Sequence, residues 1–81
     1  MSEIKAGQVW KEKELPSWRI SDSDIFVVTT VSFNKLSIVY NDGTTDYVTT
    51  DWVGGDCELL AEYPTWQEAV NSKEFNNVAE D

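Results

Sequence analysis

The sequence predicts a mainly β fold of five short strands followed by one C-terminal α-helix. Several runs alternate apolar and polar residues and are rich in Val, Ile, Thr and aromatic residues, which is typical of strands. Asn34-Lys35 and Asn41-Asp42-Gly43 separate three of these runs as tight hairpin turns would. Thr65 and Glu68 form a T-x-x-E capping box, which indicates the start of the helix.

The N-terminal part predicts one short strand, a long loop and one long strand. GQVWKEKE alternates around Val9 and Trp10, so the first strand begins after Gly7. LPSWRISDSD, with Pro16 and several Ser and Asp residues, predicts a loop that Trp18 holds against the body. DIFVVTTVSF has apolar residues on both faces, so we expect this strand to bend around a core.

Two further strands complete a meander. LSIVYN follows the Asn34-Lys35 turn, and TTDYVTT follows the second turn, where we expect Gly43 to hold a positive φ. Asp51-Trp52-Val53, followed by Gly54-Gly55, predicts a single helical turn that is closed by glycine.

The C-terminal part predicts the last strand and the helix. CELLAEY is a short strand that Pro64 ends, and the helix covers about residues 65–74. Phe75 falls opposite the apolar stripe of this helix, so either the helix ends before Phe75 or this side chain is exposed. We expect one domain over residues 1–81, with the strands within about 5–63 and a frayed tail at 76–81.

The order of these elements resembles the Src-homology-3-like small β-barrels, which include Tudor and chromo-type reader modules. The resemblance covers roughly Gly7 to Glu62, and IVYNDG is similar to the hairpin of Tudor-like domains. It implies a small five-stranded barrel with the helix added at the C-terminus. The Ala-Leu-Tyr-Asp-Tyr stretch of signalling Src-homology-3 domains is missing, so binding of proline-rich peptides is not implied. The chain is also similar to small acidic proteins of phages and prophages.

The charge of the chain is strongly negative and unevenly distributed. Fifteen acidic and six basic residues give a net charge of −9. Residues 1–35 hold five acids and five bases, whereas residues 36–72 hold seven acids and no Lys or Arg. The central and later elements therefore carry most of the negative field.

The composition excludes several kinds of catalytic site. The chain has no histidine and one cysteine, so it cannot form a Cys/His zinc site, a Ser-His-Asp triad or a Cys-His pair. We interpret carboxylate pairs such as Asp42 with Asp46 as solvated turn residues, and Cys57 as a small buried apolar residue. We expect no enzymatic activity, no metal and no cofactor.

Localisation and two classes of partner follow from other features. MSEIKAGQ lacks the pattern of a signal peptide, and no apolar run approaches the roughly 20 residues that span a bilayer. With a single cysteine as well, we expect a cytoplasmic protein that does not contact membranes. Direct binding of nucleic acid is disfavoured, because phosphate contacts need the Lys and Arg that the central strands lack.

Three interpretations of function remain, and we favour the first. In the first, a non-enzymatic binding module engages a basic protein surface through an acidic face, for example as a phage-type inhibitor or a mimic of nucleic-acid charge. The residues of this face are Asp42, Asp46, Asp51, Glu58 and Glu62, with the last two expected on one face of their strand.

The second interpretation is a reader-type module that holds a cationic or methylated side chain in an aromatic cage. The residues of the cage are Trp18, Tyr40, Tyr47 and Trp52. The third is a structural or accessory protein without a ligand, whose acids keep it soluble. The sequence does not indicate an oligomeric state.

Overall fold

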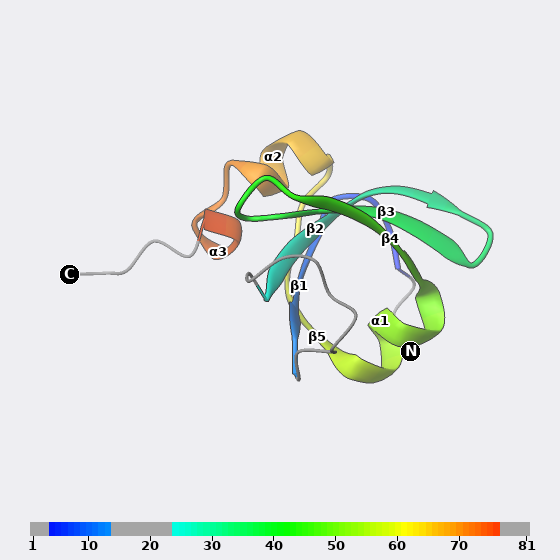
Figure 1. The fold of residues 1–81 in the computed structure, drawn as a ribbon. Helices are drawn as coiled ribbons and strands as arrows, with labels where there is room; N and C mark the ends of the chain where they lie inside the picture. The colour runs from blue at the N-terminus through cyan, green and yellow to red at the C-terminus, as the bar shows by residue number, and fades with distance from the viewer. Residues whose placement is uncertain (1–3, 14–23, 77–81) are drawn as a thin grey trace.

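The computed structural model describes residues 4–13 and 24–76 of the chain. Within them, antiparallel strands form one sheet in the order β4-β3-β2-β1-β5, accompanied by short helices (Figure 1). The elements are β1 (Gln8–Glu12), β2 (Ile25–Ser32), β3 (Lys35–Tyr40), β4 (Thr45–Thr49), α1 (Thr50–Asp56), β5 (Cys57–Glu62), α2 (Trp66–Val70) and α3 (Lys73–Asn76). The mainly β prediction is confirmed. β4 and β5 lie at the two ends of the sheet, and no strand pairing among the described residues closes it into a barrel.

The two faces of the sheet pack against different helices. The inner face carries the larger apolar cluster, which α1 helps to cover through Val53 (Figure 1). The buried members of this cluster are Trp10, Phe26, Val28, Leu36, Ile38, Tyr40, Val48, Val53 and Cys57. The outer face carries a smaller cluster beneath α2 and α3, made of Val9, Ile25, Val27, Ala69 and Phe75. Burial of apolar surface on both faces is the main favourable term in folding this sheet.

The turn between β2 and β3 differs from its prediction by one residue. Ser32 pairs with Lys35, so Phe33 and Asn34 form the turn rather than Asn34 and Lys35. Phe33 has φ 54°, a left-handed conformation that a β-carbon makes costly. The second turn matches its prediction, because Gly43 has φ 92°.

The helix after β4 is longer than the predicted single turn. Thr49 caps it by accepting a hydrogen bond of 3.2 Å from the backbone N–H of Trp52. The helix then continues through Gly54 and Gly55 to Asp56, and neither glycine has a positive φ. The prediction that glycine closes this helix is therefore wrong. The chain leaves α1 at Cys57, whose extended backbone begins β5.

Two short helices replace the single C-terminal helix that was predicted. α2 ends at Val70 and α3 begins at Lys73. Ser72 explains the break, because its hydroxyl donates to the carbonyl of Ala69 at 2.6 Å and accepts from the N–H of Phe75 at 3.2 Å. A serine that bonds to nearby backbone groups competes with helical hydrogen bonds. The break directs the side chain of Phe75 toward the sheet, and it is buried there against the outer face.

Thr65 caps α2 as its sequence predicts. Its hydroxyl accepts a 3.2 Å hydrogen bond from the backbone N–H of Glu68. We expect Thr65→Ala to lower the free energy of unfolding by about 1 kcal/mol, because the helix loses this partner. Urea denaturation would measure the change, with Thr65→Ser as the control that keeps the hydroxyl. Equal midpoints for the alanine and serine variants would contradict the capping role.

Tyr63, just after β5, is joined to α3 by a short hydrogen bond. Its hydroxyl donates to Glu74 Oε1 at 2.5 Å, and this bond holds the pKa of the Glu74 carboxyl below its usual range. A carboxyl whose pKa is lowered on folding stabilises the folded state at pH values above its unfolded-state pKa. This stabilisation is lost as the pH falls through the folded-state pKa.

In Tyr63→Phe we therefore expect the pKa of Glu74 to rise toward its ordinary value, and the loss of stability in acid to become less steep. An NMR titration of the Glu74 carboxyl carbon would measure the pKa directly. If the midpoint is the same in parent and variant, the Tyr63 hydroxyl does not set the pKa of Glu74.

Candidate functional site

Cys57 is the single cysteine of the chain and is buried in the inner cluster. Burial raises the pKa of its thiol to about 12, and the negative charges of Glu12 and Asp56 add to the increase. Such a thiol stays protonated at neutral pH and is a poor nucleophile. The prediction that Cys57 is a small buried residue is confirmed.

Among residues 4–13 and 24–76, no group of three or more Asp, Glu, Cys or His side chains is placed to hold a metal ion. In the same ranges, no helix has both the length and the apolar character that crossing a membrane requires.

The aromatic residues predicted as a cage do not share one face. Tyr40 is completely buried on the inner face, where its hydroxyl donates to Glu12 Oε2 at 2.9 Å. Trp52 is half-buried and stacks on Phe26, with ring centroids 5.9 Å apart. Tyr47 is 77% exposed and pairs with Ser37 on the outer face, while Trp18 lies outside the described residues. Tyr40 and Tyr47 therefore cannot hold one ligand together.

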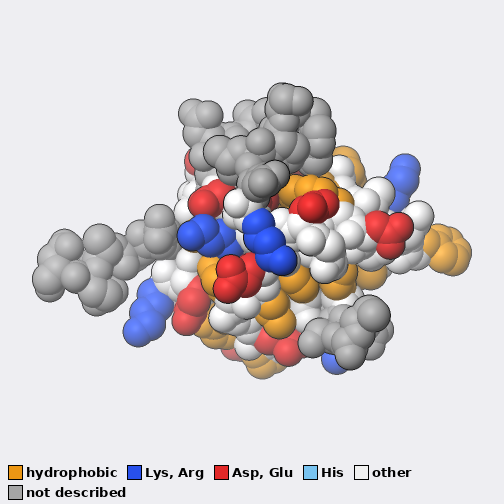
Figure 2. All heavy atoms as spheres, turned by 90° about the horizontal axis from the view of Figure 1, so that it is seen from below, with side chains coloured by type: hydrophobic (Ala, Val, Ile, Leu, Met, Phe, Trp, Pro, Cys, Tyr) orange, Lys and Arg blue, Asp and Glu red, His pale blue; other side chains and the backbone are white. Residues whose placement is uncertain are grey.

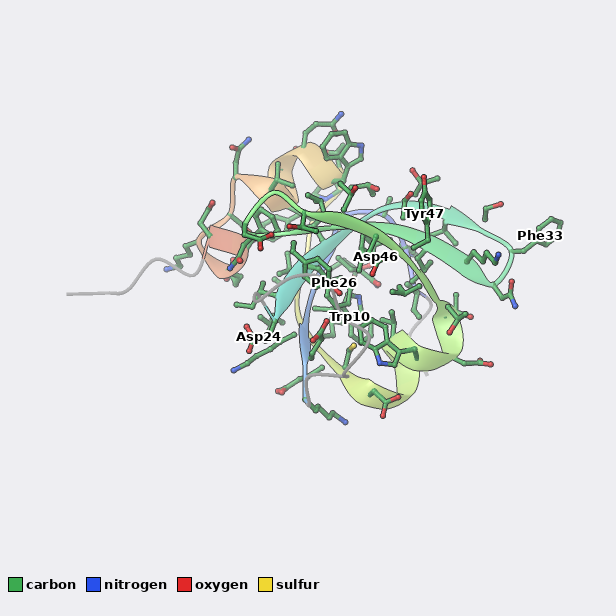
Figure 3. The ribbon with its side chains drawn as sticks, in the orientation of Figure 1. Trp10, Asp24, Phe26, Phe33, Asp46 and Tyr47 are labelled. Carbon is green, nitrogen blue, oxygen red and sulfur yellow. The ribbon has the colours of Figure 1, made fainter. Side chains whose placement is uncertain are left out.

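Three of the predicted acidic residues lie on β4 or close to its ends. Asp42 lies in the turn before this strand, where its Oδ1 accepts from the N–H of Thr44 at 2.9 Å. Asp46 lies on β4 opposite Ile38, and its side chain points to the inner side, away from that of Tyr47 (Figure 3). Asp51 is exposed in the first turn of α1, beyond the other end of β4. The strand therefore separates Asp42 from Asp51.

The two predicted acidic residues of β5 lie on opposite faces of the sheet, contrary to the expectation. Between Val9 and Trp10 the pairing of β1 with β5 shifts, so Leu60 is left without a partner. This bulge reverses the alternation of side chains along β5. Glu58 is opposite Lys11, whereas Glu62 is opposite Gln8 and accepts from its Nε2 at 3.3 Å.

The predicted acidic face is consequently divided. On the side of the molecule that Figure 2 shows, acidic and basic side chains are interspersed and form no continuous acidic surface. Asp46 does not add its charge to the surface around Tyr47, because the two side chains point to opposite faces of the sheet. Among the described members of the predicted aromatic set, Tyr47 is the most accessible to a partner.

A residue that the sequence did not single out, Phe33, lies beyond Tyr47 at the tip of the β2–β3 hairpin. Its side chain is 100% exposed and projects away from the body of the protein (Figure 3). Val31, on the same hairpin, is 40% exposed. Val31 pairs with Leu36 and so belongs to the inner face, whereas Phe33 and Tyr47 border the same hollow; we call Phe33 and Tyr47 the hairpin end. The signal for it was the bulky apolar residue within S-F-N-K, where turns usually place polar residues or glycine.

The outer face beside the hairpin end is hollowed. A hollow of about 460 Å³ lies between Phe33 and Tyr47, with Thr30 and Ser37 among its lining residues. It falls in the size range of small-ligand sites, although it is open to solvent. An apolar side chain of a partner could therefore contact both aromatic rings.

The hairpin end is connected to the first turn of α1, which carries Asp51. The backbone N–H of Thr50 donates to the carbonyl of Asn34 at 2.9 Å, which holds the start of α1 against the turn. Asp51 is the next residue, so its exposed carboxylate lies at the same end of the sheet as Phe33. Lys35 adds one positive charge there. The arrangement offers apolar anchors with one acidic residue, Asp51, at the same end of the sheet.

Comparisons of the chain with family models, with curated proteins and with solved structures found no match.

Proposed function

We propose that this protein is a small non-enzymatic binding module that engages a basic partner protein through the hairpin end. The observation that carries the proposal is Phe33, a fully exposed aromatic residue in a left-handed backbone conformation. The proposal keeps the basic partner inferred from the sequence and moves the contact surface from an extended acidic face to this end of the sheet.

The conformation of Phe33 is costly in the free protein. A left-handed conformation destabilises a residue with a β-carbon by roughly 1–2 kcal/mol, and Gly or Asn would adopt it more easily. Burial of a Phe side chain in a partner would contribute about 1.5–3 kcal/mol, which offsets that cost. Aromatic side chains that fill a partner's pocket commonly dominate binding energies.

Charge defines the kind of partner. The net charge of −9 gives the whole molecule a negative field, and Asp51 lies at the same end of the sheet as Phe33. A basic partner would be attracted at long range and then oriented by the local charge of Asp51. A phage-type inhibitor or a mimic of nucleic-acid charge would act in this way.

The strand order β4-β3-β2-β1-β5 supports the finer assignment to the Src-homology-3-like barrels, which we also propose. In this assignment the sheet curls around the inner cluster, and the hairpin end projects from it as a binding loop. The aromatic-cage alternative has less support, because Tyr40 lies in the core and Tyr47 on the outer face. The accessory alternative leaves the exposure of Phe33 without a reason.

Affinity capture from a lysate of the native host, with elution by salt, tests the proposal. The captured protein is then purified and its affinity is measured for Phe33→Ser and for Leu60→Ser. Leu60 is the matched control, because it is a partly exposed apolar residue at the opposite edge of the sheet. We expect Phe33→Ser to lose at least about tenfold in affinity and Leu60→Ser to bind like the parent.

A charge-reversed pair tests the electrostatic part. Asp51 and Glu68 are both exposed acids in the first turn of a short helix, but Glu68 lies on α2, away from the hairpin end. We expect Asp51→Lys to lower the affinity for the partner more than Glu68→Lys does. Asp51→Lys should also reduce the dependence of that affinity on salt concentration by a larger amount. A captured partner that is acidic, or full affinity in Phe33→Ser, would overturn the proposed function.

A further inference from the structure

A second hollow continues the first along the outer face of the sheet. It measures about 550 Å³ and lies between the β2–β4 surface and the C-terminal helices. Its lining residues are Thr29, Thr30, Val39, Tyr40, Asn41, Gly43, Thr45, Trp66, Val70 and Phe75. Thr30 lines both hollows, so they meet at this residue. We call the two hollows together the outer channel.

The outer channel has the chemistry of a peptide groove. Trp66 and Val70 form an apolar wall at one end, and Phe33 and Tyr47 form an apolar wall at the other. Hydroxyl groups lie between these walls, at Thr30, Ser37 and Thr45. Such groups can donate to and accept from the backbone of an extended chain.

From this geometry we propose that the outer channel binds an extended segment of the basic partner, with one apolar side chain in each hollow. This inference rests on the proposed function and names the form of the ligand. Ser37 lines the first hollow and Val39 lines the second. These residues are two positions apart on β3, which separates their α-carbons by roughly 7 Å. Side chains on one face of an extended peptide recur at that spacing, so anchors at positions i and i+2 fit the hollows.

β4 is an edge strand of the sheet, so an extended peptide could also bind by pairing with it as an added strand. The side chain of Asp46 obstructs this mode, because its Oδ1 accepts from the backbone N–H of Tyr47 at 2.7 Å. The hydrogen bonds from the N–H of Tyr40 to Thr44 and from the N–H of Thr50 to Asn34 show that the even-numbered residues of this hairpin bond across it. In an antiparallel pair the residues between them direct their N–H groups away from the partner strand, so the N–H of Tyr47 faces the open edge. A ligand is therefore expected across the outer face rather than at the edge.

Acidic residues stand at both ends of the outer channel. Asp42 lies between Asn41 and Gly43, which line the hollow beside α2 and α3. Asp51 is near the other end of the channel, close to Phe33. Lys35 is the one charged residue among those that line the channel. An apolar segment with Lys or Arg on both sides complements this pattern.

The test uses a synthetic probe of alternating threonine and leucine with two lysines at each end. One control peptide has serine in place of leucine, and the other has glutamate in place of lysine. We expect the parent protein to bind the probe at least about tenfold more tightly than either control peptide. Amide NMR shifts should change both near Tyr47 and near Val70 when the probe is added.

Two protein variants locate the binding. Thr30→Arg places a long side chain where the hollows meet, and Gln67→Arg makes the same change in charge on the exposed surface of α2, outside both hollows. We expect Thr30→Arg to lose about tenfold in affinity for the probe and Gln67→Arg to lose less than about twofold.

Equal affinities of these two variants, or equal binding of probe and serine control, would overturn the outer channel as a peptide site. The proposed function fails on a different result, because it depends on Phe33→Ser in binding the captured partner. A partner lost by Phe33→Ser but retained by Thr30→Arg would show contact at the hairpin end alone.

Discussion

Replacement of Phe26 by alanine is expected to lower the free energy of unfolding by about 3–5 kcal/mol, the largest effect of any substitution considered. Phe26 is completely buried near the start of β2, between Trp10 on β1 and Tyr40 on β3. Its ring meets Tyr40 edge to face, with centroids 5.7 Å apart, and stacks on Trp52. Alanine would leave a cavity among three large rings that strands and α1 hold in place.

A loss of this size should unfold much of the protein. A domain of 81 residues is expected to have roughly 4–12 kcal/mol of stability in total. Urea denaturation followed by tryptophan fluorescence would measure the shift in midpoint. Where the variant is unfolded without urea, glycerol or trimethylamine oxide would restore a measurable transition.

Phe33→Ala is the matched control for Phe26→Ala. It makes the same chemical change at a side chain that is fully exposed. We expect its free energy of unfolding to differ from that of the parent by no more than about 0.5 kcal/mol. If the two variants lost the same stability, Phe26 would not be the centre of the inner cluster. The pair also separates folding from binding, because Phe33→Ala should stay folded and still lose the partner.

The elements that local chemistry specifies were predicted correctly. The alternation in DIFVVTTVSF and LSIVYN indicated paired strands, which the structure contains as β2 and β3. Gly43 and Thr65 were identified because a positive φ and a helix cap each depend on one side chain and its immediate neighbours. Such features need little information from the rest of the chain.

The errors arose where a single residue changes the register or ends an element. The bulge at Leu60 reverses the faces of β5, so the even spacing of Glu58 and Glu62 did not place them together. Ser72 divides the helix through the hydrogen bonds of its hydroxyl with the backbone. From the sequence alone, a serine at this position is equally compatible with an uninterrupted helix. Gly54 and Gly55 are helical because α1 packs through Val53 on the core, and tertiary packing can override low helix propensity.

The candidate site was only partly visible in the sequence. Alternation predicts that Tyr47 and Val48 face opposite ways, but it does not say which face of β4 is covered. The structure leaves Tyr47 exposed because α2 and α3 cover the other end of the outer face. Phe33 was counted as part of a strand, and the one-residue change in the turn moved it from a strand position to the exposed tip.

Replacement of Gly7 by alanine is expected to cost about 3 kcal/mol or more, through backbone strain and a steric clash together. Gly7 has φ 99°, and a β-carbon there would lie 2.4 Å from the carbonyl oxygen of Tyr63. Backbone atoms must move to relieve this contact. Gly7 also accepts from the N–H of Tyr63 at 3.0 Å and donates to the carbonyl of Val28 at 2.9 Å, so the movement would break hydrogen bonds between three segments.

Gly43→Ala separates the two causes of this loss, because Gly43 has a similar φ of 92° but no atom within 4 Å of an added β-carbon. It should therefore show the cost of the left-handed conformation alone, roughly 1–2 kcal/mol. Urea midpoints of both variants would give the difference, which we attribute to the clash with Tyr63. Equal losses would mean that the chain after β5 shifts freely. A larger loss in Gly7→Ala would mean that the segment after β5 resists displacement, and this segment leads into α2, which carries Trp66 and Val70 of the outer channel.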